Sequence, residues 1–268
     1  AAEDQTQLMD NATIVGILEE ATAHDADAIG TEATASAMQL AVRRPGEQDL
    51  DLAVGHTRLD GAADPVTTTT RFDVASLTKP VVTGTLLMQA IAEGRCAWDD
   101  RVDDVLEGWN ESPDSKGVTL AHLANHTSGL PDWRPFYEKL CLEPSRTQVA
   151  DQRRAVRRAI RDTPLDAPPG EREVYSDLGY IVLGWALEEM LGAPLDDLAR
   201  RRIFEPLGMS RTRYVSAARG DEPVEGAVAT EDDELRGGVV AGRVHDRNTA
   251  ALGGVAGHAG IFSTASDL

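Results

Sequence analysis

Residues 72–80 read Phe-Asp-Val-Ala-Ser-Leu-Thr-Lys-Pro, and the rest of the sequence is most simply interpreted as the support of this stretch. Ser76 and Lys79 are three residues apart, so in a helix they share one face and the amine can reach the hydroxyl. A helix is predicted here, because the apolar residues that follow recur on one side. Asp73 and Ser76 are suitable caps, and Pro80 is tolerated only near a helix start. The apolar side comprises Val82, Leu86, Leu87, Ala90 and Ile91.

A hydroxyl beside an amine at a helix start is a candidate activated nucleophile. The alternative is a capping serine followed by a solvent-facing lysine, because the S-x-x-K spacing alone is weakly specific. Lysine usage favours the first interpretation: of 26 basic residues only three are lysines, and the others are arginines. Arginine keeps its proton in a protein, whereas a buried lysine can release it. A lysine beside Ser76 is therefore the residue that proton transfer requires.

The charge balance is strongly acidic, with 45 acidic residues against 26 basic ones and a formal net charge of −19. Like charge repels nucleic acid and anionic membranes, so neither is expected as a partner. The acidic residues are interleaved with periodic apolar segments, which indicates a folded chain. An acidic, lysine-poor surface suggests adaptation to high salt, where screening removes the self-repulsion. The alternative is an ordinary acidic protein.

The first residues, Ala-Ala-Glu-Asp, do not resemble the start of a signal peptide, and no apolar run is long enough to span a bilayer. Cys96 and Cys141 have no C-x-x-C spacing, so we expect buried free thiols rather than a disulfide. These features predict a reducing, cytoplasmic location. The oligomeric state is not predicted.

The amino-terminal part predicts an antiparallel sheet backed by helices. Residues 10–28 have the apolar periodicity of a helix. Residues 35–42 and 49–57 alternate like two strands, and the residues between them have the composition of a hairpin turn. A β-prone run, 66–70, then leads into the Ser76 segment.

Residues 95–162 are predicted to be mostly helical and polar, with two side-chain clusters that need an interpretation. His122 and His126 have the spacing of H-E-x-x-H zinc helices, but Leu123 replaces the glutamate that acts as the general base. We therefore favour structural histidines over metal ligands. The arginine run 153–161 is interpreted as a solvated helix face that pairs with the acidic surface, rather than a phosphate site.

Pro168-Pro169-Gly170 interrupts the chain before Tyr175 and an apolar helix predicted at 181–191. A tyrosine on a constrained loop before a helix can present its hydroxyl to a cleft, although a packing role is the simpler interpretation.

Taken together, these motifs resemble the serine hydrolases related to class C β-lactamases, a family that includes penicillin-binding DD-peptidases, D-aminopeptidases and carboxylesterases. The resemblance covers about residues 35–268, and the order of the signatures makes it specific. The signatures are Ser-Leu-Thr-Lys at 76–79, Thr-Leu at 119–120 with His-Thr-Ser-Gly-Leu-Pro at 126–131, Pro-Pro-Gly-Glu at 168–171 with Tyr-Ser-Asp-Leu-Gly-Tyr at 175–180, Phe-Glu-Pro-Leu-Gly-Met at 204–209, Val-His-Asp at 244–246, and the glycine-rich run 252–265.

The resemblance implies that Ser76 is the acylated nucleophile, Lys79 its proton partner and Tyr175 the acid/base. An amine and a phenol near each other can share the serine proton, because each affects the ionisation of the other. Many relatives have Asn at the position of Asp177. An ionised Asp177 near Lys79 would keep the lysine charged, so we hypothesise that Tyr175 is the base and Lys79 a fixed cation.

The family's third motif, K-T-G or H-x-G, lies on a strand that also supplies an oxyanion-hole N–H. His258-Ala259-Gly260 fits H-x-G by its letters, which makes His258 and Gly260 candidate substrate-binding residues. The alternative is that this run only precedes the missing strand, and that the carboxyl-terminal strands are absent from the chain.

The resemblance implies an α+β, β-lactamase/transpeptidase-like fold with an antiparallel sheet, flanking helices and a mostly helical subdomain. We expect a single domain with an amino-terminal helix and hairpin (1–75), a nucleophile helix and helical subdomain (76–215), and an acidic loop with the glycine-rich segment (216–268). The expected function is hydrolysis of a small ester, amide or β-lactam through an acyl-enzyme, without cofactor or metal. The alternative is a binding or regulatory relative that has lost turnover.

Overall fold

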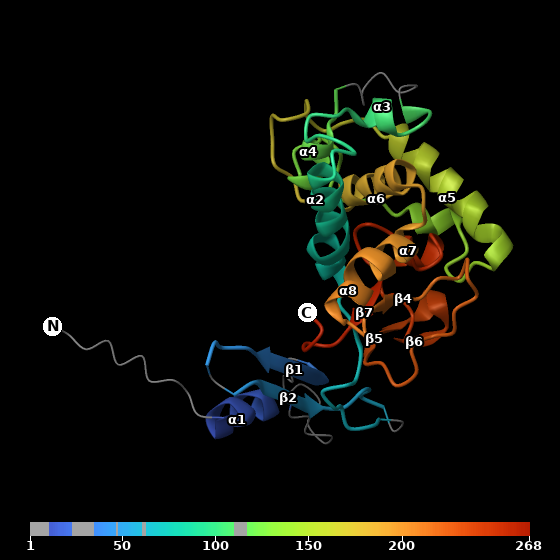
Figure 1. Ribbon diagram of the computed structural model, residues 1–268. Helices are drawn as coiled ribbons and strands as arrows, with labels where there is room; N and C mark the ends of the chain where they lie inside the picture. The colour runs from blue at the N-terminus through green and yellow to red at the C-terminus, as the bar shows by residue number, and fades with distance from the viewer. Residues whose placement is uncertain (1–10, 23–34, 47, 61–62, 110–116) are drawn as a thin grey trace.

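The computed structural model describes residues 11–22, 35–46, 48–60, 63–109 and 117–268, and every structural statement below concerns these residues. Helices gather at one end of the molecule, and a hairpin with the first helix lies at the other (Figure 1). Three small antiparallel sheets of two, three and two strands replace the single sheet that the sequence suggests. The α+β class is confirmed.

The amino-terminal hairpin forms as predicted. Strands β1 (Ala37–Val42) and β2 (Leu50–Gly55) pair antiparallel, with Ala37 opposite Gly55 and Val42 opposite Leu50. The hairpin is joined to the carboxyl-terminal residues, because the Ala265 N–H donates to Gln39 Oε1 at 2.9 Å. The first helix, α1, spans Asn11–Thr22, and residues 23–28 of the predicted helix lie outside the described residues.

Helix α6 (Asp177–Leu191) is the centre of the helical part. Ten consecutive residues, from Leu178 to Leu187, are buried, so the helix is enclosed on all sides rather than amphipathic. It begins four residues earlier than the predicted Ile181, because the Ser176 Oγ accepts a hydrogen bond from the Gly179 N–H at 3.1 Å and caps it. The elements in contact with α6 are η2 (Lys79–Gly84), α2 (Thr85–Ala92), α3 (Val102–Val105), α4 (Leu120–Ala124) and α7 (Leu195–Ala199).

The glycine-rich segment approaches α6 at backbone distance. A Cβ on Gly257 would lie 2.1 Å from the Tyr180 carbonyl oxygen and 3.1 Å from the Gly184 Cα. The Gly257 carbonyl accepts a hydrogen bond from Thr83 Oγ1 at 2.7 Å. Glycine at 257 therefore allows the segment before His258, helix α6 and the Ser76 segment to meet.

The three-stranded sheet brings the two ends of the candidate site together. Its strand order is β3-β7-β4, with β3 at Phe72–Asp73, β4 at Arg213–Tyr214 and the buried β7 at Ile261–Ser263. Asp73 lies opposite Phe262, so the chain entering the Ser76 turn runs beside the chain leaving the glycine-rich segment. The pairing is antiparallel throughout.

The Ser76 segment is helical, but its first turns are not α-helical. Ser76 lies in a 3₁₀ turn, η1 (Ala75–Leu77), and Lys79 begins η2, a π-helical stretch that leads into α2. The predicted capping role of Ser76 is therefore wrong. Asp73 does bind the turn, since its Oδ1 accepts from the Ala75 N–H at 2.8 Å. Pro80 has no N–H to donate, which is consistent with a widened first turn.

Three other predictions need correction. The β-prone run 66–70 forms no strand and contains a turn. Residues 95–162 contain one long helix, α5 (Arg146–Arg161), and otherwise short helices and loops, with 110–116 outside the described residues. The predicted acidic loop contains a β-hairpin whose first strand, 229–233, alternates between less and more exposed positions and ends at Asp233, which is buried and paired with Arg247. The remaining elements are η4 (Phe136–Lys139), η5 (Arg200–Phe204), α8 (Glu205–Leu207), β5 (Ala229–Asp233), η6 (Glu234–Arg236), β6 (Gly238–Ala241) and α9 (Arg247–Ala251).

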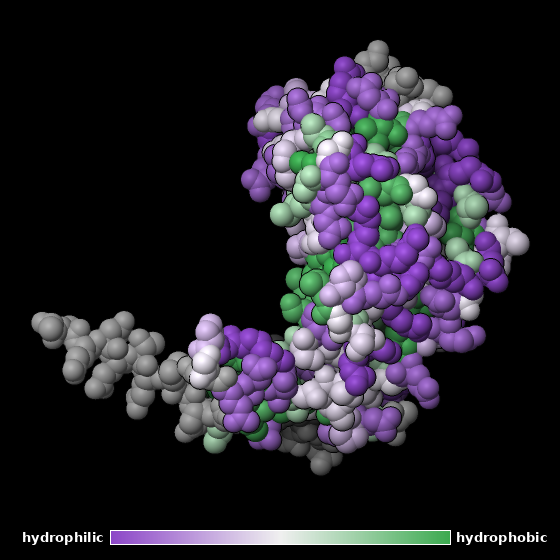
Figure 2. Space-filling view, viewed as in Figure 1, coloured by the Kyte–Doolittle hydropathy of each residue, from purple (hydrophilic) through white to green (hydrophobic). Residues whose placement is uncertain are grey.

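Hydrophilic residues dominate the face shown in Figure 2, including the region of α5. In the described part of the chain, no helix combines the length and apolar character needed to cross a membrane. Both cysteines are free, as predicted, but neither is buried as predicted: Cys96 is partly buried and Cys141 is exposed. The division into three consecutive parts of one domain stays a prediction.

Candidate active site

Ser76 is presented on a sharp turn directly after strand β3. Ala75, the residue before it, has φ +47, a left-handed conformation that residues with a Cβ seldom adopt. The turn is held by the hydrogen bond from its N–H to Asp73, and the Ser76 side chain is exposed. Backbone conformations of this kind concentrate at functional sites, because they cost free energy that the surrounding structure must offset.

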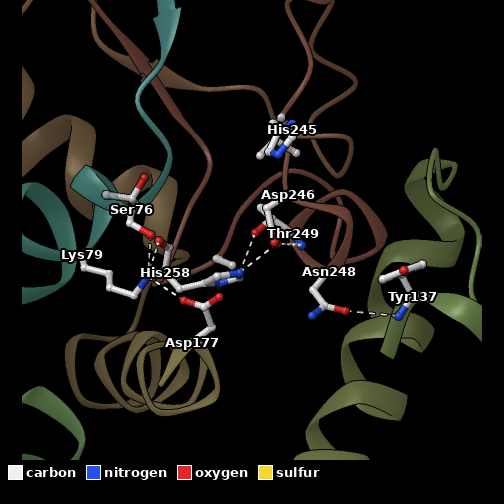
Figure 3. Close-up of polar contacts among 12 residues, drawn as sticks. Ser76, Lys79, Tyr137, Asp177, His245, Asp246, Asn248, Thr249 and His258 are labelled. Carbon is white, nitrogen blue, oxygen red and sulfur yellow. Dashed lines mark hydrogen bonds and ion pairs between the residues drawn. The ribbon is translucent and has the colours of Figure 1, made fainter. Parts of the chain in front are cut away.

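Lys79 lies beneath the Ser76 hydroxyl (Figure 3). Its side chain is buried, with 2% of the residue exposed, and its Nζ donates to Ser76 Oγ at 2.9 Å. The same ammonium donates to the His258 carbonyl oxygen at 3.3 Å. It forms an ion pair with Asp177 Oδ1 at 2.7 Å. An exposed hydroxyl is thus in contact with a buried amine, and the solvent-facing alternative for Lys79 is wrong.

Asp177 is the first residue of α6, which places its carboxylate at the positive end of the helix. Its backbone N–H donates to the Asp132 carbonyl at 2.8 Å, and its side chain is 22% exposed. The expected proximity of Asp177 and Lys79 is present in the structure. The Asp177 carboxylate and the α6 terminus therefore form one side of the site, and the Ser76 segment forms the other.

Tyr175 covers the Lys79 ammonium from the solvent side. The Lys79 Nζ lies 4.7 Å from the centroid of the Tyr175 ring, and the ring lies 4.5 Å from that of His126. Tyr175 is 56% exposed, so its phenol is open to solvent and to a substrate. The predicted loop tyrosine is therefore beside the Ser76–Lys79 pair, in a cation–π arrangement.

The two histidines of the possible zinc helix make backbone contacts. His122 Nδ1 accepts from the Thr119 N–H at 3.2 Å at the start of α4. His126 Nδ1 accepts from the Ser176 N–H at 3.0 Å, and burial together with the nearby Lys79 charge lowers the pKa of His126. Both contacts agree with the interpretation of His122 and His126 as structural histidines rather than metal ligands. The hydrogen bond to His126 also positions the loop that carries Tyr175.

His258 and Gly260 lie in the interior. A Cβ on Gly260 would meet the Gly254 carbonyl oxygen at 2.7 Å, and 1% of His258 is exposed. His258 turns its ring away from Ser76, so it reaches the site through its carbonyl oxygen rather than its side chain (Figure 3). The burial of His258 and Gly260 therefore does not support the expectation that either residue contacts a substrate directly.

Sequence reasoning gave no role to Asp246 and Thr249. Asp246 Oδ1 lies 2.8 Å from His258 Nε2 and accepts from the Thr249 N–H at 2.6 Å. Burial alone would raise the pKa of Asp246, but the His258 charge and these hydrogen bonds outweigh it and hold the pKa well below its ordinary value. The Val-His-Asp run was part of the resemblance, and its aspartate before a helix was the available signal.

Among the described residues, Asp177, Asp246 and His258 offer potential metal-ligand atoms within 4.8 Å of one another. Two carboxylates and an imidazole are a donor set that Zn²⁺ accepts. However, Asp177 is already paired with Lys79, and Asp246 with His258. We therefore assign no metal to this group.

Three hollows on the described part of the surface are not lined by Ser76. One of about 460 Å³ runs along α5 and is lined by Arg153, Trp185 and Leu252 among others. The arginines of α5 are engaged with acidic residues as predicted: Arg153 contacts Glu188, and Arg157 Nη1 lies 2.6 Å from Glu189. The candidate active site is therefore identified from the contacts of Lys79 and not from a cavity.

The fold and the contact between Ser76 and Lys79 are those expected of a β-lactamase/transpeptidase-like protein, and the comparisons agree. The family model described as Beta-lactamase matches residues 21–268. The chain belongs to this beta-lactamase family, and its β-lactamase/transpeptidase-like fold is confirmed.

Three similar proteins illustrate the relationship. A putative D-alanyl-D-alanine carboxypeptidase of Escherichia coli (strain K12) is 32% identical over 75% of this chain and 50% of that protein. An N-acetylmuramyl-L-alanine amidase of Bacillus subtilis (strain 168) is 31% identical over 75% of this chain and 48% of that protein. The structure of a beta-lactamase/D-alanine carboxypeptidase from Yersinia pestis has a TM-score of 0.65 and 25% identity, covering 96% of this chain and 67% of that one. The chain spans about half the length of these two curated relatives.

Proposed function

We propose that this protein is a serine hydrolase that acts through an acyl-enzyme on Ser76. The observation that carries the proposal is the 2.9 Å contact between the exposed Ser76 hydroxyl and the buried Lys79 ammonium. A serine hydroxyl becomes an effective nucleophile only when a neighbouring group takes its proton and the developing charge is stabilised. In this proposal Lys79 supplies the charge, and Tyr175, whose ring centroid lies 4.7 Å from Lys79 Nζ, supplies the base.

The proposed reaction has two steps. Ser76 Oγ attacks the substrate carbonyl carbon while its proton passes to the Tyr175 oxygen, and the same proton then protonates the leaving alcohol or amine as its bond to the carbonyl breaks. In the second step water attacks the ester carbonyl while Tyr175 accepts the proton of the water, and Tyr175 passes that proton to Ser76 Oγ as the ester bond breaks and the acid leaves. The ion pair with Asp177 favours the ammonium form of Lys79, which supports Tyr175 rather than Lys79 as the base.

The substrate class that we propose is a small ester, amide or β-lactam. The names of the curated relatives, a carboxypeptidase and an amidase, favour an amide. We further propose adaptation to high salt, from the net charge of −19, and a reducing, cytoplasmic location, from the two free cysteines. No cofactor is part of the proposal.

Covalent labelling tests the proposal. A fluorescent phosphonate and a fluorescent penicillin are expected to label the full chain, and Ser76→Ala should abolish the labelling. Ser210→Ala is the matched control, because Ser210 is an exposed serine on a turn outside the site. Absence of Ser76-dependent labelling at both low and high salt would favour the alternative, a relative that binds ligands without turnover.

A further inference from the structure

A second polar pair, His258 with Asp246, lies behind the Lys79–Asp177 pair. His258 Nε2 is 2.8 Å from Asp246 Oδ1 and 3.2 Å from Thr249 Oγ1, and the His258 side chain is 2% exposed. Figure 3 shows the His258 ring reaching from the Lys79 side of the site toward Asp246 and Thr249, with the Asp177 carboxylate beside it. A histidine ring nitrogen and the two carboxylates are all within 4.8 Å of one another.

The contacts of His258 define which ring nitrogen carries a proton. An ionised carboxylate only accepts hydrogen bonds, so Nε2 must donate to Asp246. The other nitrogen, Nδ1, is buried and has no hydrogen-bond partner among the described residues. A buried polar atom without a partner is costly. A carboxylate oxygen of Asp177 lies within 4.8 Å of a ring nitrogen of His258.

The surroundings of the His258 ring are acidic, because carboxylate oxygens of Asp177 and Asp246 both lie within 4.8 Å of a ring nitrogen, and Lys79 pairs with Asp177. The charged and titratable groups closest to this centre are Lys79 on η2, Asp177 on α6 and Asp246 before α9. Asp73 on β3 also faces it and accepts from the backbone N–H groups of Ala75 and His245, and the His245 side chain pairs with Glu231. His126 and Tyr175 lie on the side of α6.

We propose that His258 is a positioning residue of the Ser76 site, fixed by Asp246 and Thr249 so that its imidazole holds Asp177 in place as the counter-ion of Lys79. The residue acts on the ion pair from both sides, since its carbonyl oxygen accepts from Lys79 Nζ at 3.3 Å and its ring lies beside Asp177. The inference rests on the proposed hydrolase function, which it deepens by adding the Asp246–His258 pair to the support of Lys79.

The rate and pH profile of Ser76 labelling provide the first test. His258→Gln keeps a donor that can reach Asp246 but removes the ring and its charge. We expect the second-order labelling rate to fall about 10²-fold, the loss that a displaced catalytic group produces. The pH profile should change in the same way as in Asp177→Asn. The double variant should be no slower than the slower single variant, because both changes remove one interaction.

The control is His245→Gln, a half-exposed histidine adjacent to Asp246 that pairs with Glu231. It should leave the rate and the pH profile unchanged. Independent, multiplicative effects of His258→Gln and Asp177→Asn, or an unchanged pH profile in His258→Gln, would overturn the proposal, because a merely structural role lowers stability without coupling to Asp177.

A second test does not require activity or a variant at 258. The imidazole ¹⁵N signals of His258 should shift in Asp177→Asn and stay unchanged in Asp132→Asn, whose carboxylate is 71% exposed. Unchanged His258 signals in Asp177→Asn would overturn the contact. If the signals shift but the wild-type chain shows no Ser76-dependent labelling, the hydrolase function fails while the His258–Asp177 contact stands.

A metal at this place would also overturn the proposal. In that case dialysis against EDTA should abolish labelling, and Zn²⁺ should restore it, because the three side chains would be serving as ligands. We expect labelling to be unaffected by EDTA.

Discussion

The Lys79 ammonium and the Asp177 carboxylate are 2.7 Å apart beneath the exposed hydroxyl of Ser76. Lys79 arrives from the turn after strand β3, and Asp177 from the start of helix α6. A buried ion pair is costly to form unless both groups have further hydrogen bonds, and Lys79 has them, to Ser76 Oγ and the His258 carbonyl. The pair therefore joins the two halves of the site, and it is the contact on which the proposed role of Lys79 as a fixed cation rests.

Asp177→Asn is expected to alter the pH dependence of acylation. Without the carboxylate the Lys79 amine loses its acidic partner at 2.7 Å, so the pH dependence of the labelling rate should change. The measurement is the phosphonate labelling rate from pH 5 to 10. Asp132→Asn removes an exposed carboxylate from the loop whose backbone contacts the start of α6, and it should leave the pH profile unchanged. Identical profiles for the wild type and Asp177→Asn would show that the ion pair does not govern acylation.

Tyr175→Phe separates the phenol from the ring. The phenylalanine keeps the aromatic face 4.7 Å from Lys79 but removes the hydroxyl, and loss of a general base typically costs about 10²- to 10⁴-fold in rate. We expect a loss of labelling in that range with an unchanged melting temperature, since Tyr175 is 56% exposed.

Tyr180→Phe is the matched control for Tyr175→Phe. Its hydroxyl donates to the Ala124 carbonyl at 2.9 Å, so its removal should cost about 1 kcal/mol of stability and leave labelling intact. Full labelling by Tyr175→Phe would mean that the ring only packs on Lys79 and that another group is the base.

The parts of the fold that the sequence predicts are those with a local signal. The β1–β2 hairpin follows from alternation around a turn, and α6 from residue 181 onward follows from a long apolar run. The 66–70 run failed because threonine has strand propensity in general, while here Thr67 and Thr70 bind each other and stabilise a turn. Local pattern also missed the π-helical start at Lys79, which depends on how Pro80 and the neighbouring turn are accommodated.

The candidate site likewise contains some contacts that the sequence predicts and others that it does not. Ser76 and Lys79 are three residues apart, so their contact follows from any helical conformation. The contact between Asp177 and Lys79 was expected only because this sequence has Asp at a position where many relatives have Asn. The Asp246–His258 pair joins residues whose approach depends on the glycine-rich segment passing α6 at Gly257, and no local pattern reports that approach.

The Asp246–His258 pair should contribute to stability in a pH-dependent way. The pKa of Asp246 is lowered in the folded protein, so its stabilisation is complete above the unfolded value, near 3.8, and is lost as the pH falls below it toward the folded value. Removing one partner of a buried pair costs about 3 kcal/mol or more. Asp246→Asn should therefore be less stable at pH 6, with a shallower loss of stability below pH 4.

Urea unfolding from pH 2 to 7 checks this expectation, because urea adds no charge. Asp232→Asn is the control, since Asp232 is an exposed carboxylate on β5. It should keep both the wild-type stability and the wild-type slope in acid. Equal slopes in Asp246→Asn and the wild type would contradict the lowered pKa of Asp246.

Gly257→Ala tests the close approach of the glycine-rich segment to α6. The added Cβ would lie 2.1 Å from the Tyr180 carbonyl oxygen, which is backbone and has little freedom to move. We expect a loss of about 3 kcal/mol or more in the free energy of unfolding, the upper range for overpacking. Gly16→Ala on α1, where nothing lies within 4 Å of the new Cβ, should be neutral or stabilising by up to about 1 kcal/mol. A small effect at Gly257 would mean that the two segments can separate.

The acidic surface predicts stability that rises with salt. A net charge of −19 repels itself in dilute buffer, and at about 1 M salt the screening length falls to roughly 3 Å, so the repulsion largely disappears. We expect the melting temperature to be higher in 2 M than in 0.1 M KCl by about 5 °C or more. Asp99 and Asp104 are exposed, and replacing both with Asn lowers the negative charge by two while leaving the site untouched. This variant should melt higher than the wild type in 0.1 M KCl and gain less from added salt, because less repulsion remains to be screened. A melting temperature that does not depend on KCl in either protein would mean that the acidic residues are matched by their arginine partners and that the surface is not adapted to salt.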